Sequence, residues 1–248
     1  MIDDNKNDIA IVVAGGSGKR MGGEIPKQFT ELCGRPVLYY CLKAYEESRI
    51  DKVVLVCANE YIPLAREIMA GYGLHKTETI IPGGRERYDS VYAGLLAVKE
   101  MGGADYVQIH DAARPMVTAD MIDAMADAVR EDKALVAAVP AKDTVKKADV
   151  EGFVIETPRR KSLWSVQTPQ VFSYTELMAA YEKMMEDTGR RDVTDDASVI
   201  EKYGGGRVRI FEASYDNLKL TTPGDMILAK AILESRGMPE SSAAVGGI

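Results

Sequence analysis

Short apolar segments alternate with longer segments of helical periodicity along most of this 248-residue chain, and this alternation constrains the fold more than any other feature. The apolar, strand-like segments are residues 9–14, 53–57, 79–81, 106–109, 134–139 and 208–211. The helical segments are residues 37–47, 61–70, 89–100, 119–130, 174–185 and 224–235. This alternation predicts an α/β fold with a doubly wound, mainly parallel, Rossmann-like sheet. Such sheets bind ligands at the carboxyl ends of their strands.

Two short runs at residues 143–150 and 152–157 interrupt this alternation and flank a turn-like Asp-Val-Glu-Gly sequence. They predict a protruding β-hairpin arm at about residues 141–163. Because such an arm is too small to have its own core, we expect it to pack on a partner subunit in a homodimer. No repeat or linker divides the chain, so residues 1–236 are expected to form a single domain. The segment 237–248 is rich in Gly, Ser and Ala and is expected to be disordered.

The composition is that of a globular protein, with 46% hydrophobic residues, 28% charged residues and a net charge of −7. The negative charge argues against nucleic acid or an anionic membrane as a partner, but it does not argue against small anionic substrates, which local clusters of Arg and Lys can bind. The three cysteines form no CxxC pair that would suggest a zinc site. Because no leader-like or membrane-spanning apolar run is present, we expect a cytoplasmic protein.

A glycine-rich loop directly follows the first strand-like segment, with glycines at positions 15, 16, 18, 22 and 23. Its backbone N–H groups can approach phosphate oxygens closely. The loop lacks the spacing of a P-loop and that of a dinucleotide-binding fingerprint, which disfavours a dinucleotide-dependent oxidoreductase. It carries Arg20, and Lys27 follows a proline. Two cations beside a phosphate cradle suit the charge that develops on a transferring phosphoryl group.

This loop resembles the nucleotidyltransferase signature, in which Ala-Gly-Gly-x-Gly-x-Arg and a later Pro-Lys bind and activate a nucleoside triphosphate. More narrowly, residues 9–233 are similar to the family of 2-C-methyl-D-erythritol 4-phosphate cytidylyltransferases (IspD) of the non-mevalonate isoprenoid pathway. Six further segments carry the resemblance: residues 83–91, 110–115, 142–146, 167–170, 194–197 and 217–219. Each segment alone is a weak signal, but six in the same order are specific. The resemblance implies that residues 1–236 form one nucleotidyltransferase domain.

The resemblance also implies roles for individual residues around CTP. The catalytic cations would be Arg20, Lys27 and Lys219. The CTP-binding residues would be Ala14, Gly15, Gly16, Gly18, Gly84, Arg87, Ser90 and Ala112. Of these, Gly84 and Ser90 are expected to contact the cytosine, with Arg87 nearby.

For the acceptor, the resemblance implies Asp111, Arg114, Thr144 and Arg160 as substrate-binding residues. The last two lie on the arm, which in the family crosses to the other subunit, and either Arg159 or Arg160 fits the arm's phosphate contact. The expected cofactor is Mg²⁺, held mostly by the triphosphate with Asp111 as a further ligand. We interpret His110 as structural and residues 194–197 as a helix N-cap without a catalytic role.

The predicted reaction joins CTP to 2-C-methyl-D-erythritol 4-phosphate and releases pyrophosphate. No general base is needed, because a phosphate monoester has its second pKa near ~6 and is already ionised at neutral pH. The nearest alternative is a ribitol-5-phosphate cytidylyltransferase, but residues 112–113, Ala-Ala, resemble the methylerythritol family more than the ribitol family. An alternative of a different class is a non-catalytic nucleotide-binding module. Release of pyrophosphate from CTP would distinguish a cytidylyltransferase from such a binding module.

Overall fold

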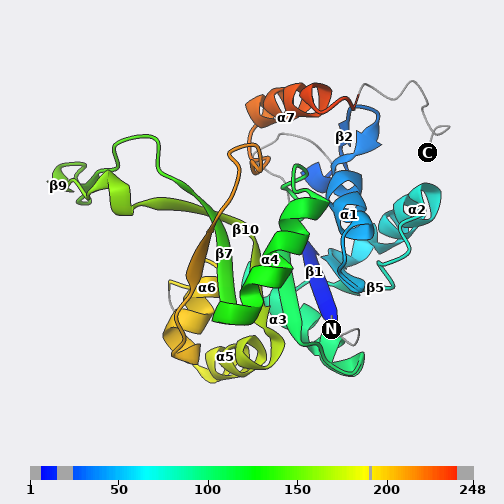
Figure 1. The fold of residues 1–248 in the computed structure, drawn as a ribbon, viewed down its shortest axis with the longest axis horizontal. Helices are drawn as coiled ribbons and strands as arrows, with labels where there is room; N and C mark the ends of the chain where they lie inside the picture. Colours follow the sequence, from blue (N-terminus) through cyan, green and yellow to red (C-terminus); the bar gives the residue numbers. More distant parts are fainter. Residues whose placement is uncertain (1–6, 16–24, 190–191, 239–248) are drawn as a thin grey trace.

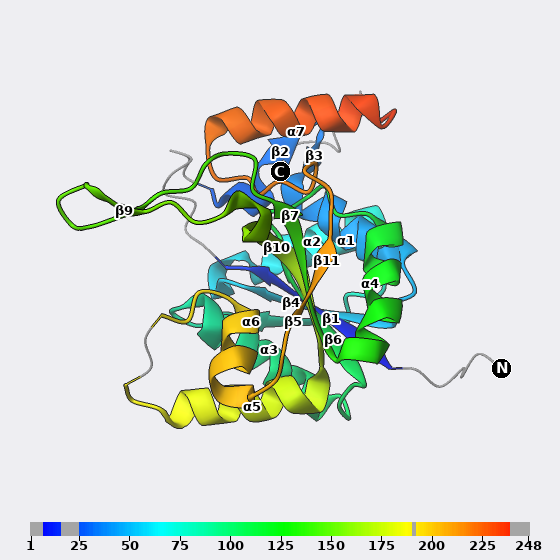
Figure 2. The ribbon, with the colours of Figure 1, turned by 60° about the vertical axis from the view of Figure 1, so that its left-hand side comes forward.

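The structure, a computed structural model, describes residues 7–15, 25–189 and 192–238. Its centre is a seven-stranded sheet in the order β11-β7-β10-β6-β1-β4-β5 (Figures 1 and 2). These strands are β1 (Asp8–Ala14), β4 (Lys52–Cys57), β5 (Thr79–Pro82), β6 (Tyr106–Asp111), β7 (Ala134–Pro140), β10 (Trp164–Ser173) and β11 (Arg209–Glu212). The pairs β1–β4, β1–β6, β4–β5 and β7–β11 are parallel, so the predicted doubly wound, mainly parallel sheet is confirmed.

Seven α-helices accompany the sheet in the described part of the chain. They are α1 (Val37–Glu47), α2 (Ile62–Tyr72), α3 (Arg87–Glu100), α4 (Ala119–Asp132), α5 (Tyr174–Glu186), α6 (Asp196–Val199) and α7 (Pro223–Ser235). Further helical turns are η2 (Lys27–Phe29), η3 (Asn59–Tyr61), η4 (Arg160–Ser162) and the π-helical η5 (Ile200–Gly204). Two small antiparallel pairs join β2 (Glu31–Leu32) to β3 (Arg35–Pro36) and β8 (Lys147–Ala148) to β9 (Val154–Glu156).

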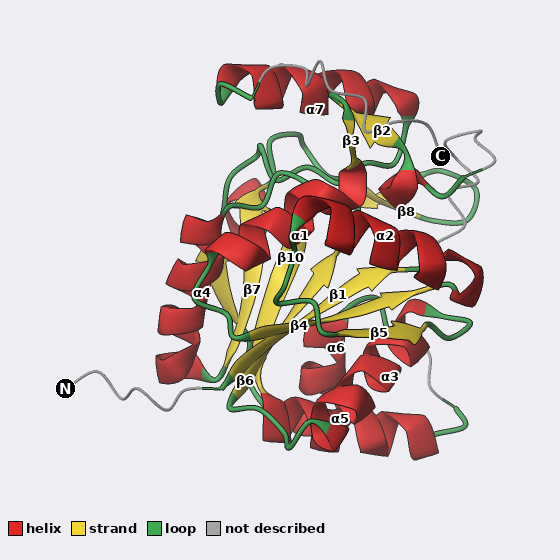
Figure 3. Ribbon diagram, turned by 90° about the vertical axis from the view of Figure 1, so that its right-hand side faces the viewer, coloured by secondary structure: helices red, strands yellow, loops and turns green. Residues whose placement is uncertain are grey.

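Both faces of the central strand β1 are buried, as its continuous apolar sequence predicts. Ala10 and Val12 point into a core that includes α1, whereas Ile9 and Ile11 point into a second core that includes α3 and α5. The two cores therefore lie on opposite faces of the sheet, with α1 and α2 on one side and α3, α5 and α6 on the other (Figure 3). This arrangement leaves the ends of the strands as the place where a ligand can reach the backbone.

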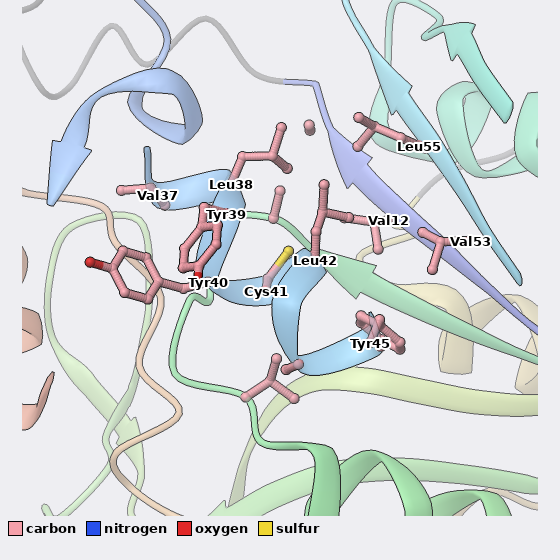
Figure 4. Close-up of a cluster of buried hydrophobic side chains, with 14 of the residues drawn as sticks. Val12, Val37, Leu38, Tyr39, Tyr40, Cys41, Leu42, Tyr45, Val53 and Leu55 are labelled. Atoms are coloured by element: carbon pink, nitrogen blue, oxygen red, sulfur yellow. The ribbon is translucent and has the colours of Figure 1, made fainter. Parts of the chain in front are cut away.

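In helix α1, the apolar residues that recur with helical spacing form the face that packs on the sheet. Its side chains at 38, 41, 42 and 45 follow the i, i+3, i+4, i+7 spacing of one helix face, and each is at most 1% exposed. They point toward the sheet, where Val12 of β1 and Leu55 of β4 belong to the same core (Figure 4). Tyr45 packs edge-on against His110 of β6, with ring centroids 5.7 Å apart. Full burial of a large apolar side chain contributes roughly 1.5–3 kcal/mol, so this face fixes α1 on the sheet.

Strand β10 is the main feature of the fold that the sequence did not predict. It runs antiparallel to both of its neighbours, β6 and β7, and its pairing with β7 shifts register between Val166 and Gln170. Its sequence contains Gln, Thr and Pro and so lacks a clean strand pattern, which explains the omission. Because it begins beside the arm and ends in the core, β10 connects these two parts of the molecule.

The predicted arm is present and protrudes from the body, with β9 near its far end (Figures 1 and 2). It carries an exposed apolar surface: Phe153 is 67%, Val154 58% and Ile155 61% exposed. The expectation that residues 237–248 are disordered concerns a segment that lies almost entirely outside the described residues. Among the residues that are described, no helix has the length and apolar character needed to cross a membrane.

Candidate active site

A cavity of about 280 Å³ lies at the carboxyl end of β6. Its lining is mostly polar and comes from five separate parts of the chain. The lining residues are Arg87, Asp111, Arg114, Val166, Gln167, Thr168, Gln170, Thr194, Asp195 and Lys219. In the order of the sheet, β4 and β5 lie on one side of β1, and β6 lies on its other side. The strand order therefore reverses between β1 and β6, and the cavity lies beside this topological switch point, where such sheets bind ligands.

Asp111, the last residue of β6, holds two cations at this cavity. Arg87 Nε donates to Asp111 Oδ1 at 3.0 Å, and Lys219 Nζ donates to Asp111 Oδ2 at 2.6 Å. Burial by itself would raise the pKa of Asp111, but these two cations outweigh burial and hold the pKa well below its usual range. Asp111 is therefore a charged carboxylate at any physiological pH, and it positions two cations at the cavity.

His110 is a structural residue, in agreement with the interpretation of the sequence. Its Nε2 lies 3.1 Å from the carbonyl oxygen of Arg114, which can only accept, so Nε2 carries the hydrogen. Its Nδ1 then accepts from the Thr168 hydroxyl at 3.1 Å, and that hydroxyl in turn accepts from the Asp111 N–H. Complete burial lowers the pKa of His110 to about 4. A neutral imidazole with both nitrogens engaged is not available as a general base.

Arg114 also faces the cavity, and a loop from the far end of the chain holds it there. One guanidinium nitrogen, Nη1, donates to the carbonyl of Asn217 at 2.8 Å, while Nε is buried without a partner. The Asn217 amide donates to the carbonyl of Thr168 at 2.8 Å and so ties this loop to β10. Burial lowers the pKa of Arg114. Such a guanidinium has donors to spare for an anionic ligand.

Lys27 lies close to this group of charges. Its Nζ donates to the carbonyl of Leu220, the residue next to Lys219. The neighbouring side chain of Gln28 donates to the carbonyl of Ala14 at the end of β1. Two of the three predicted catalytic cations, Lys27 and Lys219, are thus brought together by the fold. The third, Arg20, lies outside the described residues, as do Gly16 and Gly18 of the predicted CTP-binding loop.

Of the residues predicted to contact CTP, those that the structure describes lie at or just beyond the carboxyl ends of β1, β5 and β6. Gly84 N–H donates to Ser90 Oγ at 3.1 Å, and a Cβ placed on Gly15 would lie 3.7 Å from the same oxygen. Ala14 ends β1, and the Ala112 N–H donates to Val13 on the same strand at 3.0 Å. A Cβ on Gly84 would lie 2.3 Å from Asp89 Cβ, so the close turn before α3 requires glycine.

Arg87 begins α3 near the predicted cytosine-contacting residues, but its guanidinium extends into the cavity. In addition to Asp111, it contacts Asp196, whose Oδ2 accepts from Nη2 at 2.8 Å. Desolvation would lower the pKa of Arg87, but Asp196 and Asp111 outweigh this effect and raise it well above its usual value. The side chain is therefore a permanently charged bridge between two carboxylates.

The two predicted arm residues, Thr144 and Arg160, are exposed and do not line the cavity. Arg160 Nη1 donates to the carbonyl of Lys142 at 3.2 Å, which holds it at the base of the arm. Within one chain, therefore, these two residues are not brought together with Asp111 and Arg114.

Two segments had no assigned role in the sequence, yet they line the cavity. Gln167, Thr168 and Gln170 do so because β10 passes beside β6. Thr194 and Asp195 do so because their turn is hydrogen-bonded to Gln170 of β10. The prediction of a helix N-cap is confirmed, since Asp195 accepts from Ser198 N–H at 3.0 Å and begins α6. Both segments were recognised as motifs, but only the antiparallel course of β10 shows where they lie.

The acidic residues of the cavity fit a metal ion that is held mainly by the phosphates of a bound substrate and only in part by the protein. Among the residues that the structure describes, no group of three or more His, Cys, Asp or Glu side chains is placed to hold a metal ion. Asp111 offers one carboxylate, and both of its oxygens are already engaged by cations. Mg²⁺ commonly takes one or two carboxylates and draws its other ligands from phosphates and water. The donor set is compatible with that pattern and not with a metal bound by protein side chains alone.

Comparison with known proteins places this geometry in a family. The model of the family "2-C-methyl-D-erythritol 4-phosphate cytidylyltransferase" (IspD) matches residues 9–235. A protein of that name from Lachnospira eligens is 49% identical over 91% of this chain and 98% of its own length. Another from Clostridium botulinum is 44% identical over 93% of this chain and 98% of its own.

Solved structures agree with this match. The crystal structure of a 4-diphosphocytidyl-2C-methyl-D-erythritol synthase from Anaerococcus prevotii has a TM-score of 0.81 and 30% identity, and covers 93% of this chain and 97% of that one. An IspD structure from Francisella tularensis has a TM-score of 0.73 at 28% identity and covers 91% of this chain and 99% of that one. The chain belongs to the IspD family of CTP-dependent cytidylyltransferases.

Proposed function

We propose that this chain transfers the cytidylyl group of CTP to 2-C-methyl-D-erythritol 4-phosphate, giving 4-diphosphocytidyl-2-C-methyl-D-erythritol and pyrophosphate. The observation that carries the proposal is the gathering of Arg87, Arg114 and Lys219 around Asp111, with Lys27 adjacent. The relatives named above support methylerythritol phosphate as the acceptor, and nothing in them favours ribitol 5-phosphate. In this proposal, residues 1–236 act as one nucleotidyltransferase domain.

The chemistry follows from the charges of the site. A phosphate oxygen of the acceptor, ionised at neutral pH, attacks the α-phosphorus of CTP. The bond from that phosphorus to the bridging oxygen breaks, and pyrophosphate leaves with the electron pair. Arg20, Lys27 and Lys219 stabilise the charge that builds up on the phosphoryl oxygens. The neutral, fully engaged His110 is consistent with a reaction that needs no general base.

Enzymes of this family use a divalent cation, and we propose Mg²⁺ for this chain. Asp111 would be the side chain that holds it, together with the triphosphate, and its engagement with Lys219 would be exchanged for the metal or phosphate. When bound, the ion would neutralise charge on the triphosphate. The cytoplasmic location expected from the sequence stays a prediction.

The acceptor site would be completed in a homodimer, with Thr144 and Arg160 reaching the cavity of the partner subunit. Two observations support this arrangement: both residues lie outside the cavity of their own chain, and the arm carries exposed apolar residues such as Phe153. An apolar surface on a hairpin without a core is typical of a segment that packs on another chain.

A pyrophosphate-release assay tests the proposal. The enzyme is supplied with CTP, UTP or ATP, each paired with methylerythritol 4-phosphate or ribitol 5-phosphate. We expect release with CTP and methylerythritol phosphate alone. Release only with ribitol 5-phosphate would overturn the acceptor while leaving the cytidylyl transfer in place, and no release with CTP and either acceptor would overturn the enzymatic function.

A further inference from the structure

A continuous chain of charged hydrogen bonds runs from the protein core to the cavity. Tyr181 of α5 donates to Asp196 Oδ1 at 2.6 Å, and Arg87 donates to Asp196 Oδ2 at 2.8 Å. Arg87 then donates through Nε to Asp111 at 3.0 Å, and Lys219 completes the chain at 2.6 Å. Of these residues, Tyr181 and Asp196 lie behind the cavity and do not line it.

The burial of Asp196 is energetically unfavourable by itself. It is 0% exposed, and a buried carboxylate loses several kcal/mol of hydration unless its oxygens are fully engaged. Here both oxygens have a donor, one from a cation and one from a tyrosine hydroxyl. Replacing such a pair by apolar residues is often neutral or stabilising for a fold, so stability alone is a weak reason for its presence.

The geometry of Arg87 shows what the buried carboxylate achieves. A guanidinium is planar, so two bonds on different nitrogens fix both its position and the orientation of its plane. Asp196 binds Nη2 from behind, and Nε is thereby directed at Asp111 Oδ1. Without this anchor, the guanidinium would be free to turn toward an incoming phosphate, and Asp111 would lose one of its two aligned donors.

The turn that carries Asp196 is itself fixed to the wall of the cavity. Gln170 of β10 donates to Asp195 Oδ2 at 2.9 Å and accepts from the Ala197 N–H at 3.0 Å. Asp195 and Ser198 also form a reciprocal capping box at the start of α6. Asp196 therefore lies at a defined place relative to β10, the strand that also supplies Thr168 to the cavity.

We propose that Asp196 and Tyr181 are positioning residues of this site: they hold the Arg87 guanidinium in the orientation that aligns Asp111 for the acceptor substrate. This inference rests on the proposed function and deepens it, because it names residues that act on the reaction without touching the reactants. The test compares Asp196→Asn and Tyr181→Phe with wild type.

The chain offers a matched control in Asp8. This residue is 6% exposed and accepts from Arg130 at 2.5 Å, and the side-chain exposures of Arg130 and Arg87 are similar, 26% and 29%. Asp8 begins β1, at the end of the sheet opposite the cavity. Asp8→Asn therefore makes the same chemical change to a buried Asp–Arg pair without reaching the site.

For each enzyme we would measure kcat and the KM of both substrates in the pyrophosphate-release assay, together with the unfolding midpoint. In Asp196→Asn we expect kcat/KM for the acceptor to fall on the order of 10²-fold, as when a catalytic group is misplaced, and the KM of CTP to rise as well, because Arg87 and Asp111 also belong to the proposed CTP site. We expect a fall of about tenfold in Tyr181→Phe and less than about twofold in Asp8→Asn. Equal kcat/KM in Asp196→Asn and Asp8→Asn would overturn the positioning role.

A measurement that needs no reaction separates this inference from the proposed function. In ¹⁵N-labelled enzyme, the Arg87 Nε–H resonance, assigned by its loss in Arg87→Lys, reports whether the guanidinium is held. We expect slow exchange with water in wild type and in Asp8→Asn, and fast exchange in Asp196→Asn. Slow exchange in Asp196→Asn would overturn the inference, whereas an inactive wild type with a held Arg87 would overturn only the function.

Discussion

At the scale of single residues, the surroundings of Asp111 and His110 keep each side chain in one protonation state near neutral pH. Asp111 is held ionised by Arg87 and Lys219, and His110 is held neutral by burial. The partners of Asp111 are distant in sequence, and so is Thr168, one of the two hydrogen-bond partners of His110. Their residue types were recognisable in the sequence, but the pairing of Asp111 with Lys219 was not, because 108 positions separate them.

The buried His110 makes a prediction about stability and pH. Its pKa in the folded protein is about 4, below the value of about 6.5 in an unfolded chain. Between these values the unfolded chain binds a proton and the folded protein does not, so stability is fully present above about pH 6.5 and is lost as the pH falls toward 4.

We therefore expect wild type to lose on the order of 2–3 kcal/mol more stability than His110→Gln between pH 7 and pH 4.5. Urea unfolding curves of both proteins across this range measure the difference. Parallel pH dependences would show that the fold does not lower the pKa of His110.

Lys27 makes a prediction about rate. Lys27→Ala removes one charge from the proposed phosphate site, and loss of one such electrostatic donor typically lowers the rate on the order of 10²–10³-fold. We expect this loss of kcat in a variant that remains folded, which its unfolding curve shows. The control is Lys52→Ala, which breaks an exposed ion pair with Glu78 at 3.0 Å and is expected to leave kcat unchanged. Near-normal turnover in Lys27→Ala would remove this lysine from the mechanism.

At the scale of elements, the sequence predicted most of the strands and helices. It missed the elements that have no clear periodicity of their own and that tertiary contacts hold in place. Helix α1 was predicted with its observed bounds because its apolar residues follow a helical spacing. Strand β10 was missed because its polar residues face a cavity instead of solvent or core. The short helix α6 has only four residues, too few to show a period, although its N-cap was recognisable.

The packing of α3 on β1 gives a prediction at this scale. A Cβ on Gly94 would lie 2.5 Å from Cγ2 of Ile11, a side chain that is fully buried in the core between β1 and α3. Gly94→Ala should therefore lower the free energy of unfolding by about 1–3 kcal/mol, despite the better helix propensity of alanine.

The matched control is Gly71→Ala in α2, where an added Cβ meets nothing within 4 Å. That change should raise stability by up to about 1 kcal/mol. Denaturant unfolding of the two variants measures both values. A stabilised Gly94→Ala would mean that α3 leaves room for a Cβ beside Ile11 of β1.

At the scale of the whole molecule, the proposed dimer predicts that two inactive chains can restore each other. Lys27→Ala damages the cavity and Arg160→Ala damages the arm, so a mixed dimer would contain one site with both defects and one with neither. If subunits mix at random, half of the dimers are mixed, and we expect about a quarter of wild-type activity. Coexpression of the two variants, followed by the pyrophosphate-release assay, measures the recovery.

The outcome that contradicts this arrangement is a mixture no more active than the sum of its separate variants. Such a result would mean that Arg160 acts, if at all, within its own chain. The sequence predicted an arm but could not show that its Thr144 and Arg160 lie apart from the cavity of the same chain, because that depends on the direction in which the arm leaves the body.

The exposed arm also has a consequence for the concentration at which the protein works. If each cavity is completed by a second chain, the number of complete sites depends on an association equilibrium, which follows the law of mass action. Activity per chain should then be constant at high protein concentration and fall on dilution below the dissociation constant of the pair. A cell that makes too little of this protein would lose activity faster than it loses protein.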